Sequence, residues 1–418
     1  MRKQIVRLMS WISFLSLLLF ALVSVGMARD REKTLYIFPG GSHGDDPQTG
    51  VVSDSDGNLY GTTYYGGTYG WGTVFELKRS TNGWQQEVIY NFEGSHDGFN
   101  PTGNLLIDKA GNLYGTTLYG GSGTGCQQGA YECGGTVFEL AQSGGMWKHS
   151  VLYNFCSTSD CGDGAGPSNL IFDKAGNLYG TAGGGTGCPP NGCGIVYELR
   201  PSKGGGWTET VLYAFDQNNG GGFYPGRGVA LDDRGNIYGA TGAGGVYDYG
   251  VVFRLTRAKP GWNELILYYF IGNGDGGANG GLVLDNSGNI YGTTTWGTGC
   301  QYGCGTVFEL TRSHGQWIEK TFFFDGTNGE SPIPGLIRDN EGSLYGVTSF
   351  GGADNDGVVF KLQHNKTWKI TVLHSFSGKR DGANPEAGLL FGIDGTLYGT
   401  TSSLYDSQYG GTVFQITP

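Results

Sequence analysis

Charged residues are scarce in this 418-residue sequence, at 15% against about 25% in an average soluble domain. The shortage argues against a coiled coil or a helical bundle whose surface is held by ion pairs. Beyond residue 28 no apolar run is long enough to cross a bilayer. Basic runs are missing too, and the net charge is −11, so nothing indicates binding to nucleic acid or to an anionic membrane.

Glycine, by contrast, is abundant, with 81 residues, and aromatic residues make up 13% of the chain. Disordered chains are poor in aromatics and collagen repeats glycine at every third position, so both classes are excluded. Glycine combined with Tyr, Phe, Thr and Val is typical of many short strands joined by turns. The length allows two or three ordinary domains or one large one.

Residues 1–28 have the pattern of a secretory signal peptide. Three basic residues precede the mostly apolar stretch 8–25. Small residues at both positions that signal peptidase recognises favour cleavage after Ala28, so we expect a secreted or periplasmic protein that has no membrane contact after cleavage. The remaining residues 29–418 would form a single domain. An uncleaved membrane anchor is the alternative, since the apolar stretch is about 18 residues long.

The cysteines agree with export, because all eight fall into four close pairs. Local disulfides in an oxidising compartment are the simplest explanation. Structural zinc is the alternative, but the spacings within the pairs differ and no pair has a nearby histidine, so no metal site is predicted. The predicted disulfides join Cys126 to Cys133, Cys156 to Cys161, Cys188 to Cys193 and Cys300 to Cys304.

A Leu/Ile-Tyr-Gly motif recurs seven times along the chain. Each copy contains four short apolar runs bounded by Gly, Asn or Asp, which is typical of strands. In the second copy the runs are 104–108, 113–117, 136–140 and 151–155. Four strands repeated seven times predict an all-β fold, a seven-bladed β-propeller of four-stranded antiparallel blades, in which neighbouring blades bury each other's faces.

The two ends of the chain predict how the ring closes. The run Thr34–Phe38 matches the fourth strand of the other copies, and the last run, Thr412–Ile416, matches the third. We therefore expect these two strands to pair and to complete blade seven. Closure would also remove two open sheet edges, which otherwise invite aggregation.

Two segments of the repeat, Asp108–Thr117 and Asp285–Thr294, carry the pattern D-x-x-G-N-I/L-Y-G-T-T. Gly135–Leu140 and Gly305–Leu310 follow them with the sequence GTVFEL. In these motifs the chain resembles the GloVer tandem-repeat family of exported bacterial proteins, over essentially everything after the signal. The resemblance implies propeller-like repeats and brings no established activity, cofactor or catalytic residues.

In a propeller, the loops between strands two and three share one face with the loops from strand four to the next blade. This face would carry every cysteine pair, most of the length variation and many aromatic residues, so we expect it to bind ligands. An aromatic ring can stack on a sugar while carboxylates bond its hydroxyls; the alternative is that each ring packs against neighbouring loops. The candidate ligand-binding residues are Tyr65, Trp71, Asp97, Tyr119, Tyr249, Asp275, Trp296, Tyr302, Asp381 and Tyr409.

Other repeated residues are expected to be structural. The motif tyrosine should pack between blades with its hydroxyl bonded, and the aspartate before it should form a turn. The dinucleotide-like pattern at 272–277 lacks a strand-then-helix context, and the six histidines sit at non-equivalent places, so no catalytic residue is predicted.

Together these features favour an exported, monomeric, non-catalytic propeller that binds an extracellular glycan or peptide without a cofactor. One alternative is a polysaccharide-active hydrolase or lyase. The other is a structural module that binds a partner protein.

Overall fold

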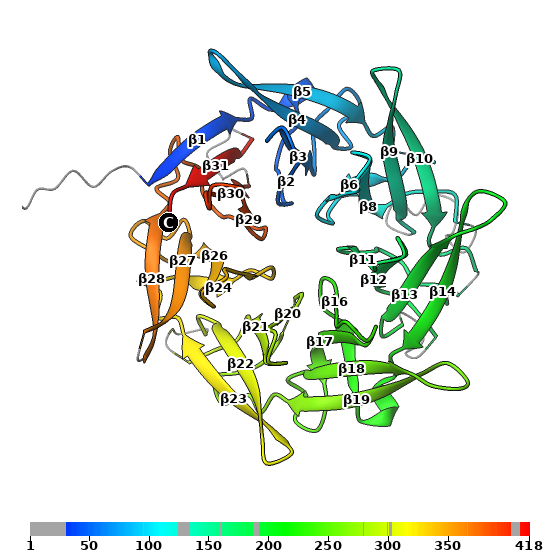
Figure 1. Cartoon of the computed structure of the whole chain (residues 1–418), viewed down its shortest axis with the longest axis vertical. Helices are drawn as coiled ribbons and strands as arrows, with labels where there is room; N and C mark the ends of the chain where they lie inside the picture. The colour runs from blue at the N-terminus through cyan, green and yellow to red at the C-terminus, as the bar shows by residue number, and fades with distance from the viewer. Residues whose placement is uncertain are drawn as a thin grey trace, which may run out of the picture.

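The computed structural model describes residues 31–418 except 95, 124–133, 159, 187–191, 279, 299, 301–302, 366 and 403–409. Seven antiparallel sheets stand around a central axis like the spokes of a wheel (Figure 1). This arrangement confirms the predicted seven-bladed β-propeller. The predicted signal peptide lies outside the described residues.

Each blade has four main strands, and three blades add a short fifth strand. In blades 1 to 3 the main strands, from the axis outward, are β2 (Val52–Ser53), β3 (Leu59–Thr63), β4 (Thr73–Ser80) and β5 (Gly83–Asn91); β7 (Leu106–Ile107), β8 (Leu113–Tyr119), β9 (Thr136–Ser143) and β10 (Met146–Asn154); and β11 (Ile171–Phe172), β12 (Leu178–Ala182), β13 (Ile195–Pro201) and β14 (Trp207–Ala214). In blades 4 to 7 they are β16 (Ala230–Leu231), β17 (Ile237–Gly244), β18 (Val251–Arg257) and β19 (Trp262–Tyr269); β20 (Val283–Leu284), β21 (Ile290–Thr294), β22 (Thr306–Ser313) and β23 (Gln316–Phe323); β25 (Ile337–Arg338), β26 (Leu344–Phe350), β27 (Val358–Asn365) and β28 (Thr367–Ser375); and β29 (Leu390–Phe391), β30 (Leu397–Thr401), β31 (Thr412–Ile416) and β1 (Glu32–Ile37). The extra strands are β6 (Phe99–Pro101) in blade 2, β15 (Gly222–Pro225) in blade 4 and β24 (Glu330–Pro332) in blade 6.

Helical structure is almost missing from the described residues. It is confined to two single-turn 3-10 helices, η1 (Gly41–His43) and η2 (Gln217–Asn219). Within the described ranges, accordingly, no helix has the length and apolar character needed to span a bilayer.

The ring closes where the sequence predicts it. Strand β1 pairs antiparallel with β31, with Glu32 opposite Ile416 and Ile37 opposite Thr412. The first strand of the chain is therefore the outermost strand of the last blade (Figure 1).

The outer strands are longer than the apolar runs predict. Strand β10 begins at Met146, five residues before the predicted run 151–155, and forms a tight hairpin with β9. Its first residues alternate between exposed and half-buried, because one side of the rim faces solvent. Polar residues are tolerated there, so the strand extends beyond its apolar part.

The hydrophobic core lies between the blades in seven clusters, each built from two neighbouring blades. A phenylalanine that follows strand four packs edge-on against an aromatic ring on strand three of the next blade, as Phe92 does on Phe138 with ring centres 5.3 Å apart. The same contact recurs seven times, from Phe38–Phe75 to Phe376–Phe414.

The glycine of the repeated Leu-Tyr-Gly motif makes room for this ring. A Cβ atom on Gly115 would lie 2.5 Å from Cζ of Phe138, closer than real contacts allow. Each motif glycine therefore lets the tip of an aromatic ring approach the backbone of strand two closely.

The turns between strands one and two are held by a repeated side-chain network. In blade 2, Asp108 Oδ1 accepts hydrogen bonds from the backbone N–H groups of Ala110 and Asn112, at 2.8 and 2.9 Å. The hydroxyl of Tyr114 lies 2.8 Å from Glu139 Oε1 and 3.2 Å from Asp108 Oδ2. Burial and these carboxylates raise the pKa of Tyr114, so its hydroxyl stays protonated. The predicted structural roles of this aspartate and tyrosine are confirmed.

Candidate functional site on the loop face

We call the face formed by the loops between strands two and three, and by the loops from strand four to the next blade, the loop face. The two kinds of loop meet directly, because β6 lies in an inter-blade loop and pairs with the end of β8, with Phe99 opposite Tyr119. Strands β15 and β24 pair in the same way with β17 and β26. The opposite face, formed by the tight turns between strands one and two, is the turn face.

Two of the candidate aromatic residues are well exposed on the loop face. Half of the surface of Tyr65 and 62% of that of Trp296 are accessible to solvent. Both lie two residues after the end of strand two, in blades 1 and 5. Phe350, at the end of β26 in blade 6, is 44% exposed. These rings are available to a ligand.

The other described aromatic candidates pack against neighbouring rings. Trp71 and Tyr119 both contact Phe99, with ring centres 4.9 and 5.5 Å away. Tyr249 meets Trp296 edge-on at 6.3 Å. Each of the three is half-buried. The remaining two candidates, Tyr302 and Tyr409, lie outside the described residues.

The candidate carboxylates bond to groups in their own loops. Asp97 accepts a hydrogen bond from the backbone N–H of Glu93 at 2.8 Å and one from the hydroxyl of Tyr90 at 2.9 Å. Asp275 is buried and accepts from the backbone N–H of Ile271 at 3.2 Å. Both side chains thus tie the turn that leaves strand four.

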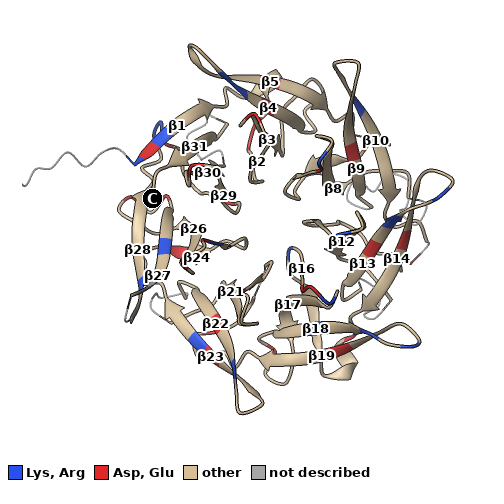
Figure 2. Cartoon of the chain, viewed as in Figure 1, with Lys and Arg blue, Asp and Glu red and all other residues tan. Residues whose placement is uncertain are grey.

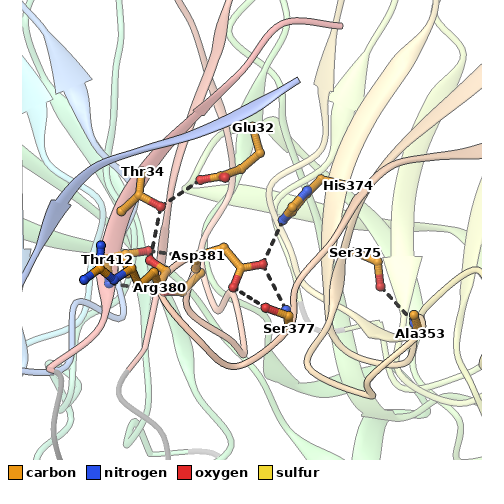
Figure 3. Close-up of polar contacts among 10 residues, drawn as sticks. Glu32, Thr34, Ala353, His374, Ser375, Ser377, Arg380, Asp381 and Thr412 are labelled. Carbon is orange, nitrogen blue, oxygen red and sulfur yellow. Dashed lines mark hydrogen bonds and ion pairs between the residues drawn. The ribbon is translucent and has the colours of Figure 1, made fainter. Parts of the chain in front are cut away.

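Asp381 is used in the same way in blade 6. Figure 3 shows its carboxylate bonded to the backbone N–H and the hydroxyl of Ser377, at 3.0 and 2.6 Å, and facing His374 Nε2 at 3.2 Å. Burial alone would raise the pKa of Asp381, but the bonds from His374 and Ser377 outweigh it and hold the pKa below its usual value. Its charge is therefore satisfied inside the loop.

Two of the predicted disulfides are present, joining Cys156 to Cys161 and Cys300 to Cys304. Both staple loops of the loop face. Cys126, Cys133 and Cys188 lie outside the described residues. Disulfides fit an exported protein, because they persist in oxidising compartments.

A hollow lies near the axis on the loop face, and we call it the axial mouth. It has a volume of about 420 Å³, and an adjoining cavity of about 210 Å³ shares Pro225, Gly226 and Arg227 with it. A third cavity of about 350 Å³, between the first strands of the blades, also reaches Arg227. The residues that line the axial mouth are Tyr224, Pro225, Gly226, Arg227, Thr295, Ser331, Pro332, Ile333, Pro334, Ser349 and Glu386.

Charged groups from opposite sides of the ring meet at the axial mouth. Burial and the nearby Asp46 raise the pKa of Glu386 in blade 7, while Arg227 in blade 4 opposes the rise. Burial raises the pKa of Tyr64 in blade 1 to about 12, again against the effect of Arg227. Arg227 is exposed, and its guanidinium makes no hydrogen bond or ion pair with any described residue.

Carboxylates greatly outnumber cations on the loop face as a whole. Figure 2 shows charged residues on the outer strands and in the loops and turns, with largely uncharged inner strands. Within the described part of the loop face, fifteen acids stand against three cations. The acids are Asp45, Asp46, Glu93, Asp97, Asp160, Asp163, Asp216, Asp248, Asp275, Asp325, Glu330, Asp354, Asp356, Asp381 and Glu386, and the cations are Arg227, Lys379 and Arg380.

Sequence reasoning missed Tyr64, Tyr224, Arg227 and Glu386. Three of them, Tyr224, Arg227 and Glu386, lie in the last part of inter-blade loops, just before strand one. A signal was present: six of these loops carry a proline at an equivalent place. The prolines are Pro47, Pro101, Pro167, Pro225, Pro332 and Pro385.

The fold and its repeats define a seven-bladed β-propeller built from seven copies of one repeat. The chain belongs to the Gloeobacter/Verrucomicrobia repeat family, whose model matches residues 21–230 and 187–414. This confirms the resemblance drawn from the repeat motifs. No match was found among curated proteins.

Several solved structures share the fold at low sequence identity. The extracellular domain of a putative one-component system from B. thetaiotaomicron has a TM-score of 0.56 and 11% identity, and the match covers 91% of this chain and 40% of that chain. A putative 6-phosphogluconolactonase from Bacteroides uniformis has a TM-score of 0.53, 12% identity and coverage of 85% and 94%. A polysaccharide lyase, an ulvan lyase bound to -[GlcA(1-4)Rha3S]-, has a TM-score of 0.53, 12% identity and coverage of 91% and 95%. At these identities the likeness shows the fold alone.

Proposed function

We propose that this protein is an exported, non-catalytic propeller that binds an extracellular glycan at the axial mouth of its loop face. The observation that carries the proposal is a hollow on the loop face with accessible aromatic residues next in the chain to residues that line it or lie beside it. Tyr65, Trp296 and Phe350 each follow directly, in the chain, a residue of the mouth or beside it. The volume of the mouth is within the range of small-ligand sites, about 300–1,000 Å³.

The chemistry of the mouth suits a saccharide. Aromatic rings stack on the apolar face of a sugar, while the carboxylates and hydroxyls beside them can bond its hydroxyl groups. Water-exposed rings such as Trp296 add little to folding, so their surface is available for binding. One protein of similar fold is described as a lyase bound to a saccharide, so the fold can hold this class of ligand.

The charge of the loop face further restricts the class of glycan that can bind. Fifteen acids against three cations create a negative potential that repels polyanions and slows their approach. A heavily sulfated or wholly uronic chain is therefore disfavoured. The proposed ligand is a glycan that is neutral or carries few negative charges.

Export is part of the proposal. The signal-like N-terminus predicts it, and the disulfides of the loop face are consistent with it. The site would then meet its ligand outside the cytoplasm.

The test is a binding screen of the full mature chain against an array of neutral and acidic oligosaccharides and peptides, followed by product analysis on each hit. We expect binding of one or more glycans without product, and a loss of at least tenfold in affinity in Trp296→Ala and Tyr65→Ala. Ile393→Ala is the matched control, because Ile393 is 92% exposed on the turn face and should be neutral. Product formation would establish the enzyme alternative, and binding of peptides alone would refute the proposal that the ligand is a glycan.

A further inference from the structure

One backbone position is shared by the inter-blade loops. The residue before the repeated proline adopts a left-handed conformation, and its backbone N–H bonds a carbonyl oxygen of the preceding blade. At this position Asp46, Asn100, Gly166, Ser331 and Asn384 have φ between 48° and 59°. Gly, Asn and Asp are the residues that tolerate this conformation best.

Blade 4 carries a tyrosine at this position, the bulkiest residue of the set. Tyr224 has φ of 57°, and its N–H donates to the carbonyl of Cys193 at 2.8 Å, as the shared geometry requires. A bulky side chain at positive φ is a conformational outlier that carries a free-energy penalty. An asparagine here would keep the hydrogen bond and relieve the strain.

The side chain of Tyr224 contributes little to the stability of the fold. Its side chain is 57% exposed, and its ring contacts only that of Phe223, edge-on at 5.0 Å, among the ring pairs of the described residues. Its hydroxyl makes no hydrogen bond to a described residue. Strain that packing does not offset is typical of residues retained for function.

The neighbouring Arg227 likewise has a side chain that bonds to no described residue. It lines the axial mouth together with Tyr224, and its guanidinium has no partner in the described ranges. Its planar group is suited to paired hydrogen bonds with a carboxylate. The other two cations of the loop face, Lys379 and Arg380, belong to the loop that leaves β28 at the outer rim.

From this pairing we infer that Tyr224 and Arg227 form a subsite for a sugar unit that carries one carboxylate, within a glycan that is otherwise neutral. The ring of Tyr224 stacks on the sugar and Arg227 binds its carboxylate, while the surrounding acids exclude chains with many negative charges. The inference rests on the proposed glycan-binding function and adds the residues and the ligand class.

The decisive variant is Tyr224→Asn, tested with the methyl glycosides of glucuronic and galacturonic acid and their neutral counterparts, glucose and galactose. We expect its melting temperature to rise by about 1–2 °C, because strain is relieved, while affinity for the uronides falls at least tenfold. Tyr224→Phe is the matched control: it keeps the ring and the strain, and should bind within about twofold of wild type. A variant that is less stable and binds as well as wild type would overturn the inference.

Arg227→Gln separates the subsite from the wider function. It should abolish the preference of the wild-type protein for uronides over neutral glycosides without changing the melting temperature. If wild type shows no such preference, while Trp296→Ala still weakens binding of neutral glycans, the subsite is wrong and the glycan-binding function stands. If wild type binds no glycan on the array, both fail.

Discussion

The turn face and the loop face of this wheel differ in how strictly the blades repeat. On the turn face, six of seven blades carry an aspartate whose side chain accepts hydrogen bonds from the backbone two and four residues later. On the loop face, the place six residues after the start of the motif holds Tyr65, Ala243, Trp296 and Phe350 in four different blades.

This difference separates stability from function. A residue that every blade needs is repeated because each blade must close the same turn and pack on the same neighbour. A residue that one blade alone carries, such as Arg227, is not needed for the turns and the packing that all seven blades share. In a repeat protein, therefore, a departure from the repeat marks a functional residue better than the repeat itself does.

Deleting residues 33–39 is expected to have the largest effect, because it removes what both faces depend on. The deletion takes away the outer strand of blade 7, exposes the edge of β31 and removes Phe38 from the core. We expect loss of cooperative thermal unfolding, followed by circular dichroism, together with aggregation. A soluble deletion variant with a sharp melting transition would show that the ring does not need this closure.

Asp108→Ala tests the turn face with a smaller change. It leaves the N–H groups of Ala110 and Asn112 without a carboxylate partner, while the hydroxyl of Tyr114 keeps its bond to Glu139. The free energy of unfolding in urea should fall by about 2–3 kcal/mol. Asp56→Ala removes the same charge from an exposed turn position and should change it by less than about 0.5 kcal/mol. Equal effects of the two variants would contradict the role given to the repeated aspartate.

The fold was predictable from the sequence because each strand type recurs seven times and errors in one copy are corrected by the others. Even the closure followed, since Thr34–Phe38 matches a fourth strand and Thr412–Ile416 a third. Strand ends were less predictable: polar residues such as Lys148 lie in β10 because the rim faces solvent on one side.

The candidate site was predictable only as a face. Exposed rings such as Trp296 stand out as loop aromatics, but Arg227 and Glu386 come from blades 4 and 7 and meet only because the chain forms a ring. Nothing local in the sequence indicates that meeting. Tyr224 could have been found, since it replaces a turn-forming residue before a repeated proline, but only by searching for departures from the repeat.

The outer strands of the blades test the link between variation and function, because one half-buried position on strand four also varies between blades. It lies on strand four, two residues after the rim tryptophan of its blade, and holds Gln86, His149, Glu209, Glu264, Glu319 and Ile370 in blades 1 to 6. If variation always marked function, these residues would matter for binding; their burial between blades argues that they affect stability instead.

Glu209→Gln tests this with the smallest expected effect. Burial, followed by the charge of Asp163, raises the pKa of Glu209 from 4.5 to about 7. The folded protein then holds a proton that the unfolded chain has lost, so stability falls as pH rises from about 4.5 to about 7, and the full penalty remains above pH 7. Glutamine, which Gln86 already provides in blade 1, has no such penalty.

We therefore expect the substitution to stabilise the protein by about 1 kcal/mol at pH 8, after allowance for the partial exposure of Glu209, and to have little effect at pH 4. Urea unfolding at the two pH values measures the difference. Glu341→Gln, at an exposed turn position, should show no pH-dependent gain. A gain for Glu209→Gln that is equal at both pH values would mean that the buried charge is not its source, and a loss of glycan binding would move this position from the structural to the functional class.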